Sequence, residues 1–192
     1  ALGAAAFVPS TTTRHLALFA LEEYQLGAGK LVFGGRVAHA RIESEGDGPG
    51  QSQFGPAQSR SFTPFSAAIG GVYNLNPQWQ LLGNLSYTER APSFFELYAN
   101  GLHVATGAYE QGNPDLAMEK GTNLDVSLAW TEGPNSLTLG AFGSDFSNYI
   151  ALLATGQEVL TDEGLVPVYA FTGVPVRMYG AEVEGTWRQS LD

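Results

Sequence analysis

Most of the chain alternates apolar and polar residues, which is the two-residue period of a β-strand with two different faces. Residues 79–88 give the clearest example. One face there carries Trp79, Leu81, Gly83, Leu85 and Tyr87. The other face carries Gln80, Asn84, Ser86 and Thr88, with Leu82 as the exception. The same alternation recurs over residues 122–130, so both segments are predicted to be half-buried strands.

The pattern predicts about seven long strands joined by two kinds of connection. The expected strands are 15–26, 30–42, 61–73, 79–88, 122–130, 136–150 and 175–188. Short turns are expected near Gly27, Asn76 and Gly133, whereas long loops are expected at 43–60, 90–119 and 151–174. Short turns on one side and long loops on the other are typical of outer-membrane barrels.

The predicted strands reach about 12 residues, enough to cross an apolar band of ~25 Å when tilted. Soluble sandwiches use shorter strands, commonly about 5–6 residues. Aromatic residues near strand ends would form interfacial girdles, although a soluble barrel core is the alternative. They are Trp79, Tyr87, Trp130, Tyr179 and Trp187. The expected fold class is therefore all-β, an antiparallel transmembrane β-barrel fragment.

Seven strands are too few and of the wrong parity to close a bacterial barrel. Residues 1–192 are accordingly expected to form part of a single larger barrel domain. The first seven residues lack the basic n-region of a signal peptide.

Composition narrows the possible partners. The net charge of −10 argues against nucleic acid, which requires clustered basic side chains. The chain has no cysteine, which excludes disulfides and thiolate metal sites. Acidic residues concentrate in the predicted loops, either for solubility or to attract cations. They are Glu43, Glu45, Asp47, Glu96, Glu110, Asp115, Glu158, Asp162 and Glu163.

The long segment 90–119 carries the most specific residues. It reads Arg-Ala-Pro-Ser from Arg90, then Glu-Leu-Tyr from Glu96, His-Val-Ala-Thr from His103, and Gly-Asn-Pro-Asp-Leu from Gly112. Together with the Tyr-Gly-Ala-Glu run from Tyr179, this segment resembles TonB-dependent outer-membrane receptors. The resemblance implies uptake of a scarce nutrient across the bacterial outer membrane, with lipid around the barrel. It also implies a plug domain and contact with TonB, for which this chain carries no sequence.

Within that family, residues 96–106 look most like the zinc-uptake branch. The resemblance implies that His103 is a metal ligand, and Glu96, Glu110 and Asp115 are loop carboxylates that could join it around zinc. The alternative for His103 is a packing residue hydrogen-bonded to backbone. The chain has none of the His-rich loops that the branch can carry. Zinc would be the transported ligand rather than a resident cofactor.

Other residues in these segments have expected structural roles. Arg90 is expected to pair with an acid of the lumen, and residues 113–115 are expected to form a turn. Asn123, Asp125, Glu182 and Glu184 are expected to line the lumen.

The sequence therefore predicts TonB-dependent transport of a metal ion, zinc above all, or of a metal chelate. A passive porin-like barrel or an outer-membrane enzyme is the alternative. An enzyme is not expected because no activated nucleophile is recognisable. A porin would not need the segment 90–119.

Overall fold

The computed structural model describes residues 6–48, 50 and 52–188, and these form one sheet with a single short helix. Residues 1–5, where most of the expectation about a signal peptide falls, lie outside this part. The elements are β1 (Thr11–Leu26), β2 (Gly29–Ser44), β3 (Gln58–Phe62), β4 (Phe65–Asn74), β5 (Trp79–Arg90), α1 (Phe94–Tyr98), β6 (Asn100–His103), β7 (Ala108–Gln111), β8 (Glu119–Glu132), β9 (Asn135–Thr161) and β10 (Gly164–Thr186). None of the described helices is long and apolar enough to span a membrane.

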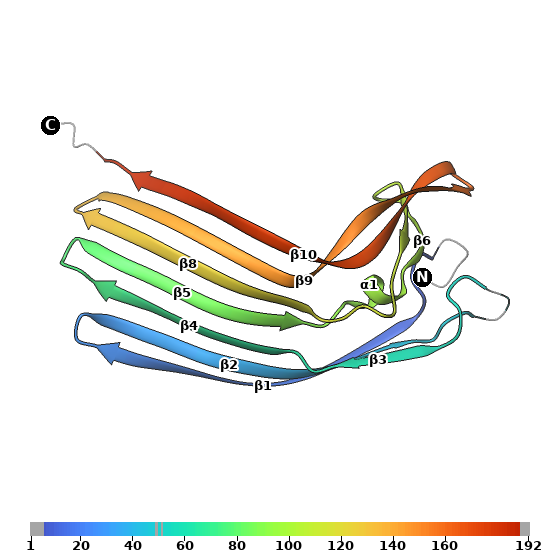
Figure 1. The fold of residues 1–192 in the computed structure, drawn as a ribbon, viewed down its shortest axis with the longest axis horizontal. Helices are drawn as coiled ribbons and strands as arrows, with labels where there is room; N and C mark the ends of the chain where they lie inside the picture. Colours follow the sequence, from blue (N-terminus) through green and yellow to red (C-terminus); the bar gives the residue numbers. More distant parts are fainter. Residues whose placement is uncertain (1–5, 49, 51, 189–192) are drawn as a thin grey trace.

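The long strands lie side by side in sequence order. The sheet runs β1-β2-β4-β5-β8-β9-β10-β7-β6, with β3 attached to β2. Every pairing is antiparallel except that of β7 with β10. Tight turns gather at one end, whereas α1, β6 and the long connections gather at the other (Figure 1). The all-β fold with seven long strands is confirmed, with β3, β6 and β7 as short additions.

The register aligns the two faces of the strands across the sheet. On one face Trp79 lies opposite Trp130, and Leu85 lies opposite Leu124. Leu85 is 48% exposed and Leu124 is 51% exposed, so this apolar face has little cover within the described chain. The opposite face is polar. Its members include Asn84, Ser86, Asn123, Asp125, Ser127 and Glu182.

One predicted strand in the N-terminal half and one predicted loop in the C-terminal half are wrong. Residues 61–73 form two strands rather than one, because Pro64 has no N–H to donate and its carbonyl instead accepts from Ala38 N (3.0 Å). The predicted loop 151–174 is a continuation of β9 and β10, which meet in a turn at Asp162 and Glu163. Pro175 lies at a shift of the β9–β10 register, where a strand tolerates proline without ending.

The segment between β5 and β8 is not an open loop. It forms α1, which packs against the polar-side face of β2, where Ala38, Ala40 and Ile42 are buried, and the β6–β7 hairpin, which pairs with β10 through β7. Arg36, which points to the same face of β2 as these residues, pairs with Ser66 of β4, and Ser66 pairs with Thr88 of β5. The buried β2 residues therefore lie on the polar face of the sheet. A small apolar core joins the segment to the wall. It comprises Ile42, Phe62, Leu97, Tyr98, Ala99, Leu116, Ile150 and Phe171.

Candidate functional site

Residues 91–118 connect β5 to β8, and we call them the inward segment; near its start is a helix cap. The Ser93 side chain accepts from Glu96 N (3.4 Å), and Glu96 Oε2 accepts from Ser93 N (2.6 Å). This reciprocal capping box satisfies two backbone donors that a helix start leaves without partners. It also fixes the Glu96 side chain, which is 9% exposed, in one orientation.

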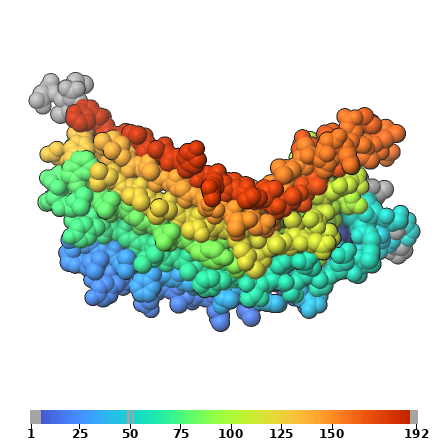
Figure 2. Space-filling model, viewed as in Figure 1, coloured from blue at the N-terminus to red at the C-terminus, as the bar shows by residue number. Residues whose placement is uncertain are grey.

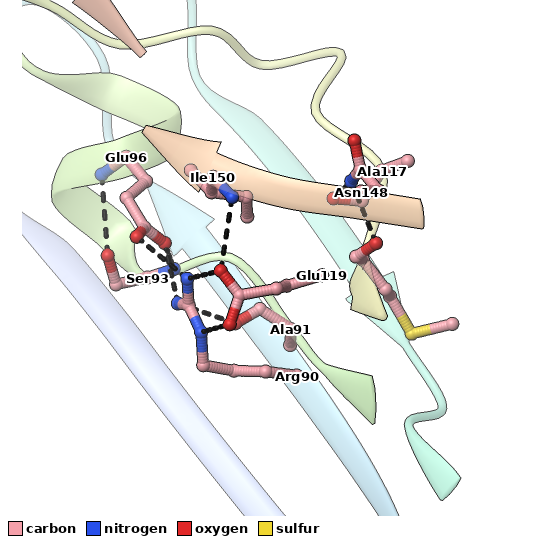
Figure 3. Close-up of polar contacts among 9 residues, drawn as sticks. Arg90, Ala91, Ser93, Glu96, Ala117, Glu119, Asn148 and Ile150 are labelled. Carbon is pink, nitrogen blue, oxygen red and sulfur yellow. Dashed lines mark hydrogen bonds and ion pairs between the residues drawn. The ribbon is translucent and has the colours of Figure 1, made fainter. Parts of the chain in front are cut away.

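Arg90 joins this cap to the sheet (Figure 3). Its guanidinium donates to both oxygens of Glu96, at 2.9 and 3.1 Å. It also donates to both oxygens of Glu119, at 3.1 and 3.0 Å. Paired two-point contacts of this kind give Arg–carboxylate bridges their geometric specificity. We call Arg90, Glu96 and Glu119 the ionic clamp.

The clamp connects four segments of the chain. Arg90 ends β5, Glu96 lies in α1, and Glu119 starts β8 while accepting from Ile150 N of β9 at 3.0 Å. Burial by itself would raise the pKa of the Glu119 carboxyl, but the Arg90 hydrogen bonds, the Ile150 N–H and the Arg90 charge together lower that pKa. The clamp lies three register positions beyond the Tyr87–Thr122 pair, outside the apolar band. The expected pairing of Arg90 with an acid on the polar face is thus present.

His103 is the last residue of β6 in the β6–β7 hairpin. Its Nδ1 is 2.8 Å from Glu110 Oε1, and the Glu110 side chain is 5% exposed. Thr106 Oγ1 donates to the same carboxylate oxygen at 3.0 Å. The Phe7 ring stacks on the imidazole with centroids 4.6 Å apart. The His103 ring therefore bonds to a carboxylate, not to the backbone.

The contact with Glu110 favours one tautomer of His103. An ionised carboxylate can only accept, so beside one the tautomer with the proton on Nδ1 donates to Glu110 and leaves the lone pair on Nε2. Among the described residues Nε2 has no hydrogen-bond partner. The His103 side chain is 35% exposed, so the ring is only partly covered.

The structure brings together only two of the four predicted metal ligands. His103 and Glu110 are in contact, whereas Glu96 is committed to Arg90. Asp115 lies in the predicted turn, where Asn113 Oδ1 accepts from its backbone N (2.9 Å), and its side chain is 99% exposed. Within residues 6–48, 50 and 52–188, no three His, Asp or Glu side chains are grouped to hold a metal. A metal role for these residues stays a prediction.

A cavity of about 450 Å³ lies beside the same hairpin. It is bounded by β6, β7 and the turn between β9 and β10, with Gln53 on a third side. The sequence did not predict this cavity. One of its walls is the tip of the β9–β10 arm, by which we mean the paired parts of β9 and β10 over residues 151–174, and these residues were expected to form a loop.

Comparison with known proteins gives the family. A model of the family "TonB dependent receptor-like, beta-barrel" matches residues 1–192. The iron-regulated outer membrane virulence protein of Vibrio cholerae is 30% identical over 158 residues, which are 80% of this chain and 22% of that protein. Hemoglobin and hemoglobin-haptoglobin-binding protein C of Haemophilus influenzae is 32% identical over 100 residues, which are 51% of this chain and 9% of that protein. The chain thus spans about a fifth or less of these relatives.

Solved structures show the same fold at low sequence identity. The copper transporter OprC has a TM-score of 0.71 at 18% identity, over 94% of this chain and 27% of its own. The Serratia marcescens hemophore receptor HasR, solved with HasA and heme, has a TM-score of 0.66 at 16% identity, over 93% of this chain and 32% of its own. The matches do not single out zinc uptake. The chain belongs to the TonB-dependent receptor β-barrel family, whose members are receptors and transporters of the bacterial outer membrane rather than enzymes.

Proposed function

We propose that this chain forms part of the wall and ligand-facing segments of a receptor that imports a metal ion or metal chelate. The observation that carries the proposal is the segment 91–118, which folds inward over the polar face at the loop end of the sheet. An inward segment narrows the route along that face and presents side chains to a ligand. The relatives named above are called iron-regulated, hemoglobin-binding and copper-transporting, which supports a metal-containing cargo.

The proposal assigns the remaining functions to other parts of the protein. The apolar face, with Leu85 and Leu124 exposed, would contact lipid. Further strands, a plug domain and the contact with TonB would come from sequence outside residues 1–192.

Zinc is the finer form of the proposal and depends on His103. A histidine that ligates a metal commonly donates its other ring N–H to a carboxylate, which fixes the ring and raises its basicity. His103 and Glu110 have this arrangement, at 2.8 Å. Glu110 would then orient His103 rather than bind the metal itself. Zinc accepts imidazole nitrogen readily, and further ligands would come from the rest of the receptor.

A zinc titration of the full receptor, with iron and copper as competitors, tests this assignment. His103→Ala is expected to weaken zinc binding at least tenfold, or ~1.4 kcal/mol. Glu110→Gln is expected to weaken it less, because the ligand remains but loses its orienting charge. His39→Ala is the matched control, since His39 lies on β2 opposite Leu16 of β1. Unchanged zinc binding in His103→Ala would leave His103 as scaffolding and move the search to chelates.

Energy dependence separates this function from a passive pore. Uptake of the metal by cells is expected to stop when TonB is deleted. Uptake that continues at the same rate without TonB would support the porin-like alternative.

A further inference from the structure

We propose that the cavity beside the β6–β7 hairpin binds the organic part of a metal chelate that carries net positive charge. The inference rests on the proposed metal uptake and names its ligand class. The volume of about 450 Å³ falls in the range of ~300–1,000 Å³ that holds small organic ligands. The tip of the β9–β10 arm, in orange, stands clear of the sheet above this region (Figure 2).

Hydrogen bonds hold the floor of the cavity in place. Gln53 Nε2 donates to the Ala6 carbonyl (3.1 Å) and to the Asn100 carbonyl, and Asn100 Nδ2 donates back to the Gln53 carbonyl. Tyr109 Oη donates to Asn100 Oδ1 at 3.1 Å, so the aromatic wall is fixed to the same residue. A cavity whose walls are already ordered loses little conformational entropy when a ligand enters.

One wall of the cavity is apolar. Leu102 and Tyr109 lie opposite each other in the hairpin and share a face, and Val104 follows with 74% of its surface exposed. Covering these side chains with an apolar or aromatic ligand body removes their surface from water, which is favourable. An inorganic ion alone would leave this wall exposed.

The opposite wall is acidic. Asp162 and Glu163 lie in the β9–β10 turn, and within the described chain neither forms an ion pair. The three long connections, 43–60, 91–118 and 151–174, hold nine acidic residues and one basic residue, Arg60. Carboxylates beside a cavity with an apolar wall concentrate cations there and repel anions. The wall chemistry therefore selects a cationic chelate and rejects an anionic one.

The cavity and His103 are separable sites. Gly101 and His103 are paired with Glu110 and Ala108 on one face of the hairpin, whereas Leu102 and Tyr109 lie on the other. Gly101 also lines the cavity but has no side chain, so substitutions of Leu102, Val104 or Tyr109 leave the His103 and Glu110 side chains unaltered.

Equilibrium dialysis of the full receptor tests the proposal with two probes, the cationic zinc–phenanthroline complex and the anionic zinc–EDTA complex. The cationic complex is expected to bind at least tenfold more tightly. Asp162→Asn is expected to weaken it about threefold to tenfold, and Val104→Thr to weaken it without changing its salt dependence. Glu158→Gln is the matched control, because it removes one charge from β9 outside the cavity.

Equal binding of the two complexes, or equal effects of Asp162→Asn and Glu158→Gln, would overturn the proposal. His103→Ala distinguishes the two levels of the inference. If the cationic complex still binds to His103→Ala while free zinc does not, both sites stand. If free zinc binding never depended on His103 but Asp162→Asn weakens the complex, the cavity stands and the zinc assignment falls.

Discussion

At the scale of single residues, the ionic clamp decides how the inward segment is held. Glu96 is almost fully covered and lies in a helix of only five residues, too short to be stable by itself. Arg90 forms ion pairs with Glu96 and Glu119 at once, and it thereby ties the end of β5 to the first turn of α1 and to the start of β8. A guanidinium is suited to this role because its planar fork contacts two carboxylates at once.

Arg90→Ala is expected to lower the stability of α1 and the hairpin by about 1–3 kcal/mol, because it leaves the buried Glu96 carboxylate without its partner. The cost is not larger because Arg90 is partly exposed and water screens the ion pair. Hydrogen exchange at Leu97 and Ala99, whose amides bond to Ser93 and Phe95 carbonyls, reports this directly. Arg41→Ala, which breaks the more exposed Arg41–Glu43 pair, is the control and should leave these amides protected. Equal amide protection in the Arg90→Ala and Arg41→Ala variants would show that the ionic clamp does not hold α1 in place.

The lowered pKa of Glu119 predicts a pH dependence. A carboxyl whose folded-state pKa is lowered stabilises the fold above its ordinary value of 4.5, and that contribution is lost as pH falls through the folded-state pKa. The segment should hence stay ordered from pH 7 to about pH 4.5 and loosen below it. A spin label at position 104, where the side chain is 74% exposed, measures the mobility. In Glu119→Gln the mobility should no longer change with pH over this range.

At the scale of elements, the hairpin lies close against the end of α1. A Cβ at Gly112 would lie 2.7 Å from backbone atoms of Leu97, Tyr98 and Ala99. Backbone atoms cannot move aside as a flexible side chain can. The close approach allows Gly112 N to donate to the Ala99 carbonyl, so the hairpin and the helix form one unit.

Gly112→Ala is expected to force the hairpin from α1 and to cost about 1–3 kcal/mol through overpacking. Loss of amide protection at Tyr109 and Gln111, which pair with β10 and β6, is the measurement. Gly143→Ala on β9 is the control, because an added Cβ there meets no atom within 4 Å. Equal amide protection of the hairpin in the Gly112→Ala and Gly143→Ala variants would show that the end of α1 can move to make room for the added Cβ.

At the scale of the molecule, the two faces of the sheet meet different surroundings. The apolar face carries exposed side chains over all seven long strands, from Leu18 on β1 to Val183 on β10. The polar face carries amides and carboxylates that pair between strands, such as Asn84 with Asp125 at 3.5 Å. This division fits a wall between lipid and a wet interior.

Leu85→Arg should impair membrane assembly of the full receptor by about 2–4 kcal/mol, the cost of a cation near the middle of a lipid-facing strand. Ser86→Arg places the same side chain on the opposite face of β5 and should assemble normally. The folded fraction in lipid vesicles, measured across a urea series, compares them. Equal losses in the two variants would contradict the assignment of one face to lipid and the other to the interior.

The sequence by itself determined the seven long strands, the tight turns and the assignment of faces. Those features are local or repeat every two residues, so each strand reveals them without reference to its neighbours. The segment 90–119 also identified the family from residues in order along the chain.

Only the tertiary structure decided what the long connections do. Residues 151–174 lie beyond the apolar band, where pairing between β9 and β10 needs no lipid-facing alternation, so their pattern does not reveal a strand. Glu119 was found as the partner of Arg90 because the register of β5 and β8 places them opposite each other, 29 residues apart in sequence. His103 contacts Glu110 but neither Glu96 nor Asp115. Glu96 is held in the capping box of α1, and Asp115 lies in the turn that follows the hairpin. Contacts between distant segments depend on register and packing, which no local pattern encodes.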